Sequence, residues 1–391
     1  MESGNLTESI LSRENLYKAM RHVVQNKGAA GVDGMRHTEL AAYLGEHIEE
    51  IREEIRSGSY EPQPVLRTEI PKPDGGTRKL SIPTMRDRFV QQAIAQALTP
   101  VFEPQFHSHS YAFRPGRCAQ QAVLATLDMM NAGLTWAADL DIEKFFDAVD
   151  HSALLTVLGQ TVRETNVIVV IWKFLVRGSD PNGPYGRCHG IPQGGNISPL
   201  LANVMLNELD WELERQGFRF VRYADDCIIL TGSRKDAERA QAFAAGCLEG
   251  RLFLRLNERK SRVGRPGEIK YLGFGYYKDL RSGKYMAKPH AESEERLIAQ
   301  ADLLTEAAAE SPEGLARLNT LLRGWVNYFG IGSMKCFCRD TDRHIRGRLR
   351  ALQENACLAP GPGTGNALSA GAGVCGLLSM ERCYDAARCL F

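Results

Sequence analysis

Apolar residues recur at helical spacing in the N-terminal part of the chain. Residues 11–28 form one such segment, in which Ser12 is a good N-cap residue for the helix. Residues 37–58 form a second amphipathic segment with a charged outer face. Residues 65–84 contain two strand-like runs on either side of an Asp-Gly-Gly turn, which predicts a β-hairpin. Helical spacing returns at residues 87–106. We therefore expect helices that surround one hairpin here.

Strand-like apolar runs alternate with helical ones in the middle of the chain. The strand-like runs are residues 136–142, 218–232 and 270–277. Between the first two, a glycine-containing turn leads to Ser198, an N-cap candidate, and to a helix that reaches about residue 217. From about residue 285 the pattern predicts helices only, including residues 311–330 with Leu and Trp325 at helical spacing. The chain thus divides into a mixed part and a helical part.

Composition narrows the class of protein without naming it. The 391 residues are 43% hydrophobic and 24% charged, which is typical of a soluble globular protein. No apolar run is long enough to cross a bilayer, so we expect a soluble, intracellular, cytoplasmic protein with no membrane partner. The net charge of +1 argues neither for nor against a nucleic-acid partner. The ten cysteines lack paired zinc spacing, which makes structural zinc improbable.

Two adjacent carboxylates interrupt the apolar run of residues 218–232. Asp225 and Asp226 repel each other and are costly to bury without a cation. Asp139 and Asp141 alternate onto one face of another predicted strand. An isolated Asp pair is most simply a solvated turn, but two strands that both carry Asp favour a Mg²⁺ site. Two such ions about 3.5–4 Å apart can clamp the oxygens of a phosphoryl transfer.

The order of several motifs then identifies a family. The chain resembles group II intron-encoded reverse transcriptases and maturases, in particular the compact bacterial branch that lacks an endonuclease domain. The resemblance extends over residues 8–350 and rests on these motifs: "IPKPDGGTRKLSIPT", "SYAFRPGRCAQQAV", "DIEKFFDAVDH", "GIPQGGNISPLLAN", "YADD", "YLGF" and "LNTLLRGWVNYFG". It implies an RNA-directed DNA polymerase that uses an RNA template, a DNA primer and dNTPs, and that binds intron RNA.

The same resemblance implies a fold and its division into parts. The fold class would be α+β: a right-hand polymerase with helical fingers, an antiparallel-sheet palm and a helical thumb or maturase region. The expected parts are an N-terminal extension at 1–60, fingers and palm at 61–284, the thumb at 285–350 and an atypical Gly/Ala/Cys-rich tail at 351–391. The composition of the tail predicts poor order at its start.

The resemblance assigns catalytic, metal-binding and nucleotide-binding residues. It implies that Asp141, Asp225, Asp226 and the Ile142 carbonyl hold two Mg²⁺ ions, for which Mn²⁺ could substitute. The implied dNTP-binding residues are Lys72, Arg78, Phe146 and Gln193, with Phe146 excluding a 2′-hydroxyl. Three of these residues have a plainer alternative: the hairpin with Lys72 and Arg78 could be a solvated edge, and Phe146 could be a core aromatic.

Primer, template and RNA contacts are implied in the same way. The primer- and template-binding candidates are Arg114, Gly194, Lys260, Leu272 and Gly273. Arg114 fits a buried salt bridge equally well, and the glycine turn fits a simple helix entry. The RNA-binding candidates are Arg323 and the stripe Arg339, Arg343, Arg346 and Arg350. That stripe could also be a solvated face in which Asp340 and Asp342 are partial partners.

The C-terminal tail departs from the family pattern. From about residue 351 the chain becomes Gly/Ala/Cys-rich and slightly acidic, where the family continues as a basic DNA-binding segment. Truncation, replacement and translation in another frame all stay open as its origin, and so does binding of a DNA target. Two other functions also stay open: an RNA-binding splicing cofactor with little polymerase activity, and a domesticated reverse transcriptase in host defence or repair.

Overall fold

The structure is a computed structural model, and it describes residues 5–71, 75–180, 185–186, 188–358 and 377–388, with side chains described up to residue 352 and again from 377. It divides into two compact units. The first comprises Met1–Cys118 and Ala138–Val263, and the second comprises Ala119–Ala137 and Gly264–Phe391.

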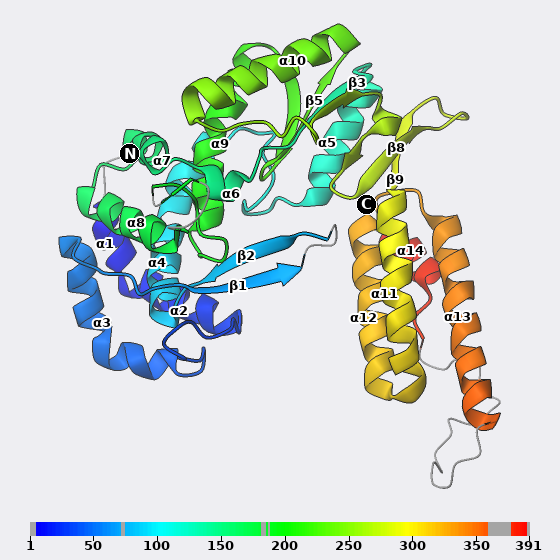
Figure 1. Ribbon diagram of the computed structural model, residues 1–391, viewed down its shortest axis with the longest axis horizontal. Helices are drawn as coiled ribbons and strands as arrows, with labels where there is room; N and C mark the ends of the chain where they lie inside the picture. Colours follow the sequence, from blue (N-terminus) through cyan, green and yellow to red (C-terminus); the bar gives the residue numbers. More distant parts are fainter. Residues whose placement is uncertain (1–4, 72–74, 181–184, 187, 359–376, 389–391) are drawn as a thin grey trace. The chain divides into compact units, whose positions relative to one another are not determined.

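The first unit is mainly helical around one hairpin and one sheet (Figure 1). Its helices are α1 Leu6–Leu11, α2 Arg13–Gln25, α3 Leu40–Ser57, α4 Met85–Phe102, η1 Glu103–Gln105, α6 Phe145–Ala148, α7 His151–Thr161, α8 Thr165–Gly178, α9 Ser198–Arg215, α10 Arg234–Cys247 and the π-helical turn η2 Leu248–Leu252. The expected caps are partly confirmed. Ser12 accepts a hydrogen bond from the Asn15 amide at the start of α2.

The predicted hairpin at residues 65–84 is confirmed. Strands β1 (Leu66–Pro71) and β2 (Thr77–Ile82) pair antiparallel, with Ile70 opposite Arg78. Most of the β1 side chains are exposed, so this hairpin is not part of the core. Its base is fixed to the turn before α9, because the Ser81 amide donates to the Gln193 carbonyl at 2.8 Å.

The sheet that carries the carboxylates has the strand order β4-β5-β3-β6. Its strands are β3 Trp136–Leu140, β4 Arg219–Tyr223, β5 Asp226–Thr231 and β6 Arg262–Gly264. Burial does not alternate along β5, because the residues from Cys227 to Thr231 are all buried. Helices therefore cover this sheet, and α9 and α10 contact β4 and β5, respectively.

Two predicted element boundaries are wrong in this unit. The strand expected at residues 136–142 ends at Leu140, because the amide of Asp141 turns to donate to the Ser261 hydroxyl. Ser198 is the first residue of α9 and not its N-cap. Its hydroxyl donates to the Pro192 carbonyl at 2.7 Å, so it holds the preceding turn and does not cap the helix amides.

The second unit combines a three-stranded antiparallel sheet with long helices (Figure 1). Its elements are α5 Ala119–Asn131, η3 Pro266–Glu268, β7 Lys270–Tyr271, β8 Phe274–Lys278, β9 Tyr285–Pro289, α11 Ala291–Glu310, α12 Pro312–Phe329, α13 Lys335–Leu358 and α14 Met380–Arg388. The expectation of helices only from about residue 285 is wrong, because β9 pairs with β8 before α11 begins. The helical α12 is confirmed, with Leu318 and Leu322 buried.

The end of the tail forms a buried helix, which the composition did not indicate. Helix α14 packs against α12 and α13 (Figure 1), with Met380 and Tyr384 at 0% and 1% exposure. Asp342 of α13 caps its N-terminus, accepting from the Ser379 hydroxyl and the Met380 amide at 2.8 and 2.9 Å. Residues 377–388 thus belong to the core of this unit, while residues 359–376 lie outside the described residues.

Among the described residues, no helix has the combination of length and apolar character that a membrane span requires.

Candidate active site

The adjacent aspartates lie at the end of a tight antiparallel hairpin. Tyr223 pairs with Asp226, so Ala224 and Asp225 form a two-residue loop. Ala224 has a φ of +58°, which is unfavourable for a residue with a Cβ by about 1–2 kcal/mol. The Nη1 of Arg222 donates to the Ala224 carbonyl at 3.0 Å and so supports this conformation. The loop presents Asp225 half-exposed and Asp226 exposed.

The neighbouring strand brings the other carboxylates to the same place. Strand β3 is adjacent to β5, and Asp141 follows its last residue. The segment after β3 pairs with residues 255–257 through two backbone bonds, Glu143 N to Arg255 O and Asn257 N to Asp141 O. Neither bond uses the carbonyl of Ile142, which leaves that oxygen available to a ligand.

Electrostatics show that the carboxylates act on one another. Desolvation by the surrounding protein, followed by the charges of Asp225, Asp139 and Asp141, raises the pKa of Asp226 to about 7. Because the Asp226 side chain is itself exposed, we give the like charges the greater weight in this shift. Desolvation also raises the pKa of Asp139 to about 6. The pKa of Asp225 is raised by desolvation and by Asp141, while Arg78 opposes the shift.

These oxygens fit the chemistry of Mg²⁺. The neighbouring basic side chains do not offset the mutual repulsion that raises the pKa of Asp226, and a divalent cation would supply further positive charge. Among the described residues, no three His, Cys, Asp or Glu side chains already stand close enough to enclose a metal. Mg²⁺ does not require such an enclosure, because it commonly uses one or two carboxylates together with waters and substrate phosphates.

Basic side chains border the carboxylates. The Lys260 Nζ lies 3.9 Å from Asp141 Oδ2, and the Arg262 Nε lies 3.7 Å from Asp139 Oδ2. Lys260, Arg262 and Arg78 are all exposed and can move toward a ligand. Lys72 lies outside the described residues. The structure therefore places Lys260 beside Asp141, and the charge of Arg78 acts on Asp225, while their roles in primer and dNTP binding stay predictions.

The two phenylalanines after Asp141 have different surroundings. Phe145 is buried at 2% exposure, whereas Phe146 is half-exposed, and their rings meet edge to face at 5.2 Å between centroids. The backbone of Phe146 accepts a hydrogen bond from the Ile191 amide, next to the Gln193 turn. Phe145 thus belongs to the core, and the sequence prediction for Phe146 and Gln193 stays a prediction.

The two glycines after Gln193 lie close to other parts of the protein. A Cβ on Gly194 would lie 2.6 Å from the Ser81 carbonyl oxygen, and its φ is +122°. A Cβ on Gly195 would lie 2.7 Å from the Gln91 Oε1. The backbone contact and the positive φ explain Gly194 without nucleic acid, whereas the contact of Gly195 is with a side chain that can shift. A template contact at Gly194 therefore stays a prediction.

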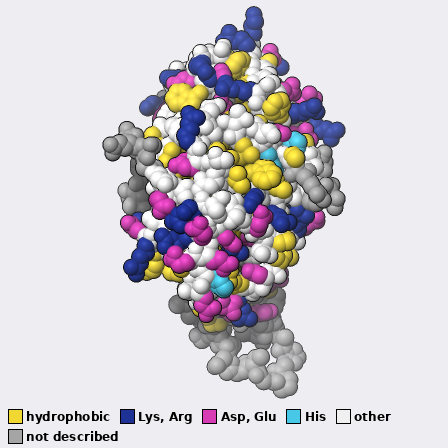
Figure 2. Space-filling model, turned by 90° about the vertical axis from the view of Figure 1, so that its left-hand side faces the viewer, with side chains coloured by type: hydrophobic (Ala, Val, Ile, Leu, Met, Phe, Trp, Pro, Cys, Tyr) yellow, Lys and Arg dark blue, Asp and Glu magenta, His cyan; other side chains and the backbone are white. Residues whose placement is uncertain are grey.

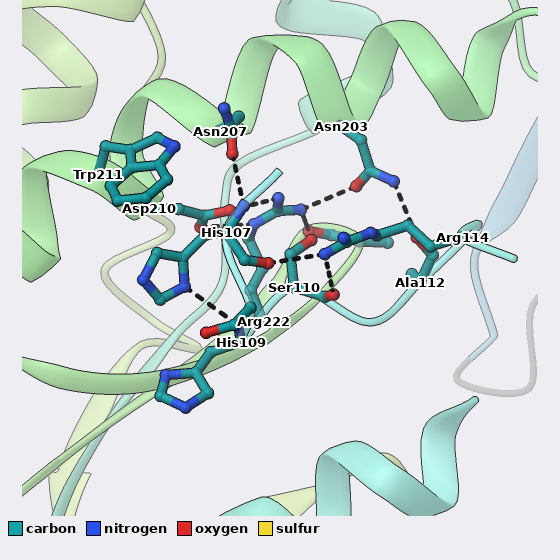
Figure 3. Close-up of polar contacts among 12 residues, drawn as sticks. His107, His109, Ser110, Ala112, Arg114, Asn203, Asn207, Asp210, Trp211 and Arg222 are labelled. Atoms are coloured by element: carbon teal, nitrogen blue, oxygen red, sulfur yellow. Dashed lines mark hydrogen bonds and ion pairs between the residues drawn. The ribbon is translucent and has the colours of Figure 1, made fainter. Parts of the chain in front are cut away.

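Arg114, a template candidate from the sequence, is instead a buried structural residue (Figure 3). It is 7% exposed and forms a 2.7 Å ion pair with Glu103. Its Nη1 also donates to the carbonyls of His107 and Ser110, at 2.6 and 2.8 Å. With its donors occupied inside the protein, the guanidinium is not available to a phosphate, so the buried salt-bridge alternative is correct.

A buried ion pair beneath the hairpin loop was not found from the sequence (Figure 3). Arg222 of β4 and Asp210 of α9 both have 0% side-chain exposure, and their two bonds are 2.7 and 2.6 Å long. The Nη1 of Arg222 also donates to Asn203 Oδ1 at 3.1 Å. The available signal was a charge within each of two apolar runs, which is costly unless the charges pair.

In the second unit the predicted primer-binding turn packs against α12. Leu272 and Gly273 both have positive φ, +52° and +81°, and connect β7 to β8. The Leu272 carbonyl accepts from the Tyr328 hydroxyl at 3.0 Å, and the Gly273 carbonyl accepts from Ser293 Oγ at 2.9 Å. These contacts fix the conformation of the turn, while its role in primer binding stays a prediction.

The arginine candidates of the helical region differ in availability. Arg323 on α12 and Arg350 on α13 are exposed, and within the described residues no ion pair engages either of them. Arg339 and Arg343 are exposed but share Asp340, at 4.0 and 3.1 Å. Arg346 is half-buried and donates to the Leu377 carbonyl at 3.4 Å, so it also holds the tail segment.

Comparison with known proteins accounts for this arrangement. Residues 70–276 match the family described as reverse transcriptase (RNA-dependent DNA polymerase). The chain belongs to the reverse transcriptase family. Residues 305–356 match the maturase-specific domain of group II introns. The mixed helix and antiparallel-sheet fold is accordingly that of a right-hand polymerase, in agreement with the sequence prediction.

Relatives of this reverse transcriptase come from bacteria and from yeast. Protein YkfC of Escherichia coli strain K12 is 34% identical over 66% of this chain and 78% of its own. The group II intron-encoded protein LtrA of Lactococcus lactis is 35% identical over 51% of this chain but only 34% of LtrA. A putative COX1/OXI3 intron 1 protein of Saccharomyces cerevisiae is 31% identical over 43% of this chain and 20% of its own.

Proposed function

We propose that this protein is an RNA-directed DNA polymerase that also binds group II intron RNA and assists splicing and retrotransposition. The carboxylate cluster carries this proposal. Asp225 and Asp226 at a hairpin loop and Asp141 after the adjacent strand influence one another's charge. Such clustering is costly for folding and is explained by a reaction in which cations and phosphates collect there.

Each residue near the cluster has a role in this proposal. Asp141, Asp225 and the Ile142 carbonyl would hold Mg²⁺, or Mn²⁺ in its place, with Asp226 as a further ligand. Bound Mg²⁺ would neutralise the triphosphate and the developing charge on the reacting oxygens. Arg78 and Lys72 would bind the dNTP phosphates. Lys260, whose Nζ lies 3.9 Å from Asp141, would contact the end of the primer. There the 3′-oxygen of the primer would attack the α-phosphate of the dNTP, and pyrophosphate would leave.

Selection of the nucleotide would depend on Phe146 and Gln193. The half-exposed ring of Phe146 is backed by the buried Phe145, so it cannot retract readily into the core. A 2′-hydroxyl on the incoming sugar would collide with that ring, which favours dNTPs over ribonucleotides. Gln193 would pack against the new base pair from a turn that is hydrogen-bonded to β2.

Intron RNA would bind the second unit through its exposed arginines. Arg323, Arg339, Arg343 and Arg350 are all solvent-exposed, and each phosphate contact made by such a side chain increases the salt dependence of binding. A match to the maturase-specific domain over the helices that carry them supports this assignment. We propose that the complex acts in the cytoplasm.

The decisive experiment is primer extension by the Asp225→Ala/Asp226→Ala variant on an RNA template with dNTPs and Mg²⁺. We expect extension to be lost while affinity for structured RNA is retained, because the cluster and the arginines lie in different units. The control is Asp128→Ala, which removes an exposed carboxylate from α5. DNA synthesis by the double variant at the rate of the control would refute the metal-binding assignment.

A further inference from the structure

A cleft in the first unit lies between α8 and the segment that leads into β1. Its volume is about 520 Å³, within the range of about 300–1,000 Å³ that is typical of small-ligand sites. Trp172, Lys173 and Arg177 of α8 line one side, and Glu61, Val65 and Arg67 line the other. None of these residues was assigned a role by the sequence motifs or by the carboxylate cluster.

The charges that line the cleft are predominantly positive. The Lys173 Nζ is 2.7 Å from Glu61 and donates to the Gly58 carbonyl at 3.0 Å, so this pair is nearly neutral. Arg67 donates to the Ser179 carbonyl and lies 4.0 Å from Asp180. Arg177 is exposed, and no hydrogen bond or ion pair engages it within the part of the chain that the structure describes. One cation is therefore available for an anion.

An aromatic side chain lines the same cleft as this cation. Trp172 is 44% exposed, which leaves a large apolar surface in contact with water. Trp172 and Arg177 lie about 7.5 Å apart along the axis of α8 and about 140° apart around it, but both line the cleft, so one ligand in the cleft can reach both. A flat aromatic group and a cation that line one cleft can recognise an unpaired base together with its phosphate.

The position of the cleft links it to the reaction. Arg67 pairs with Ser81 in the β1–β2 hairpin, and Arg78, three pairs further along, lies opposite Ile70. Three residues along a strand span about 10 Å. The charge of Arg78 acts on Asp225, so this part of the hairpin lies near the carboxylate cluster. The hairpin therefore extends from the cleft toward the cluster. A nucleic-acid strand that follows the hairpin away from the cluster would reach the cleft within a few nucleotides.

We propose that this cleft binds an unpaired nucleotide of the template strand ahead of the active site, with its base stacked on Trp172 and its phosphate beside Arg177. The inference rests on the proposed polymerase function and adds a template site to it. The chain carries a net charge of only +1, and on the face that Figure 2 shows Lys and Arg are interspersed with Asp and Glu. The excess of positive charge in the cleft is therefore a local feature, and it favours a polyanion over an apolar protein segment.

The test measures binding of primer–template duplexes whose 5′ RNA overhang is absent or eight nucleotides long, using wild type, Trp172→Ala and Arg177→Gln. Loss of a stacked base should weaken binding of the overhang duplex by about 5- to 30-fold in Trp172→Ala, with little change for the duplex without an overhang. Arg177→Gln should lower the slope of log K against log salt by about 0.7 for the overhang duplex only.

A matched control is available on another helix of the same unit. Trp211 of α9 is 42% exposed, close to the 44% of Trp172, but does not line the cleft. Trp211→Ala should leave the dependence on the overhang unchanged, and Trp172→Phe should retain most of the affinity. Equal affinities of wild type and Trp172→Ala for the overhang duplex would overturn the proposal and favour a protein partner for the cleft.

The outcome is separable from that of the polymerase proposal. Trp172→Ala should still extend a primer on a short template, whereas Asp225→Ala/Asp226→Ala should bind the overhang duplex normally without extending it. A Trp172→Ala variant that loses affinity equally for both duplexes would also overturn the template-site assignment, because the loss would not depend on the overhang.

Discussion

The buried pair of Arg222 and Asp210 allows a quantitative test of how the catalytic loop is held. Both side chains have 0% exposure, and the guanidinium makes bonds of 2.7 and 2.6 Å to the carboxylate. A third bond, 3.0 Å long, reaches the carbonyl of Ala224 in the loop that carries Asp225. The perturbation is a set of three variants: Arg222→Met, Asp210→Leu and the double variant.

Each single variant leaves one buried charge without its partner. Breaking a buried pair in this way costs about 3–5 kcal/mol of unfolding free energy, a large share of the roughly 5–15 kcal/mol typical of a domain. In the double variant both charges are replaced by apolar side chains of similar length. Replacing the ion pair itself then costs little. The buried Asn203 Oδ1 and the Ala224 carbonyl still lose their donor, so we expect the double variant to cost about 1–3 kcal/mol, less than either single variant.

The reaction rate should not follow stability in the double variant. The Arg222→Met change removes the donor to the carbonyl of Ala224, the loop residue with φ +58°. The loop therefore loses this hydrogen bond even though no unpaired charge is left in the core. A displacement of about 1 Å in a reacting group can reduce a rate by about 100-fold. We therefore expect the double variant to regain part of the stability that the single variants lose, while its single-nucleotide incorporation rate falls by about 10- to 100-fold.

Urea denaturation and pre-steady-state incorporation measure the two quantities on the same samples. Arg114→Met is the control, since it removes another buried arginine of the same unit, one that pairs with the half-exposed Glu103 and makes no bond to the loop. Two results would refute the reasoning. Single variants that cost less than about 1 kcal/mol would contradict the burial argument. A double variant with the wild-type rate would show that the pair serves folding alone.

Three further perturbations test the site and the tail. Phe146→Ala should raise ribonucleotide incorporation, and an unchanged dNTP/rNTP ratio would remove its role in sugar selection. The pKa values of about 7 for Asp226 and about 6 for Asp139 lie above the ordinary 3.8, so the metal-free folded protein binds protons more tightly than the unfolded chain. Its stability should therefore fall as pH rises from about 4 to about 7 in EDTA, and thermal melts of Asp226→Asn should show a weaker fall. Tyr384→Ala should destabilise the second unit by about 3–5 kcal/mol in urea denaturation, whereas Tyr384→Phe, which keeps the ring and loses the bond to the Gly332 carbonyl, should cost about 1 kcal/mol. Equal stabilities of both variants and wild type would contradict the docking of α14.

Much of the polymerase unit could be predicted from the sequence, because its signals are local. The hairpin of residues 65–84 follows from an Asp-Gly-Gly turn between two strand-like runs, and the loop at Asp225 follows from charges between apolar strand halves. Alternation placed Asp139 and Asp141 on one face, and although the strand ends at Leu140, both charges act on Asp226 as expected from the sequence. These features depend on backbone propensity and periodicity over a few residues.

Partnerships between distant residues required the tertiary structure. The sequence left Arg114 between a template contact and a salt bridge, and only the position of Glu103 and two carbonyls decided for burial. Arg222 and Asp210 are twelve positions apart on different elements, so nothing local pairs them. The tail shows the same limit: its Gly- and Ala-rich composition suggested poor order, yet Asp342 and the apolar faces of α12 and α13 stabilise α14. Sequence patterns thus determined where the charges lie along each element, whereas burial and pairing, which set their energies, were decided by packing between elements.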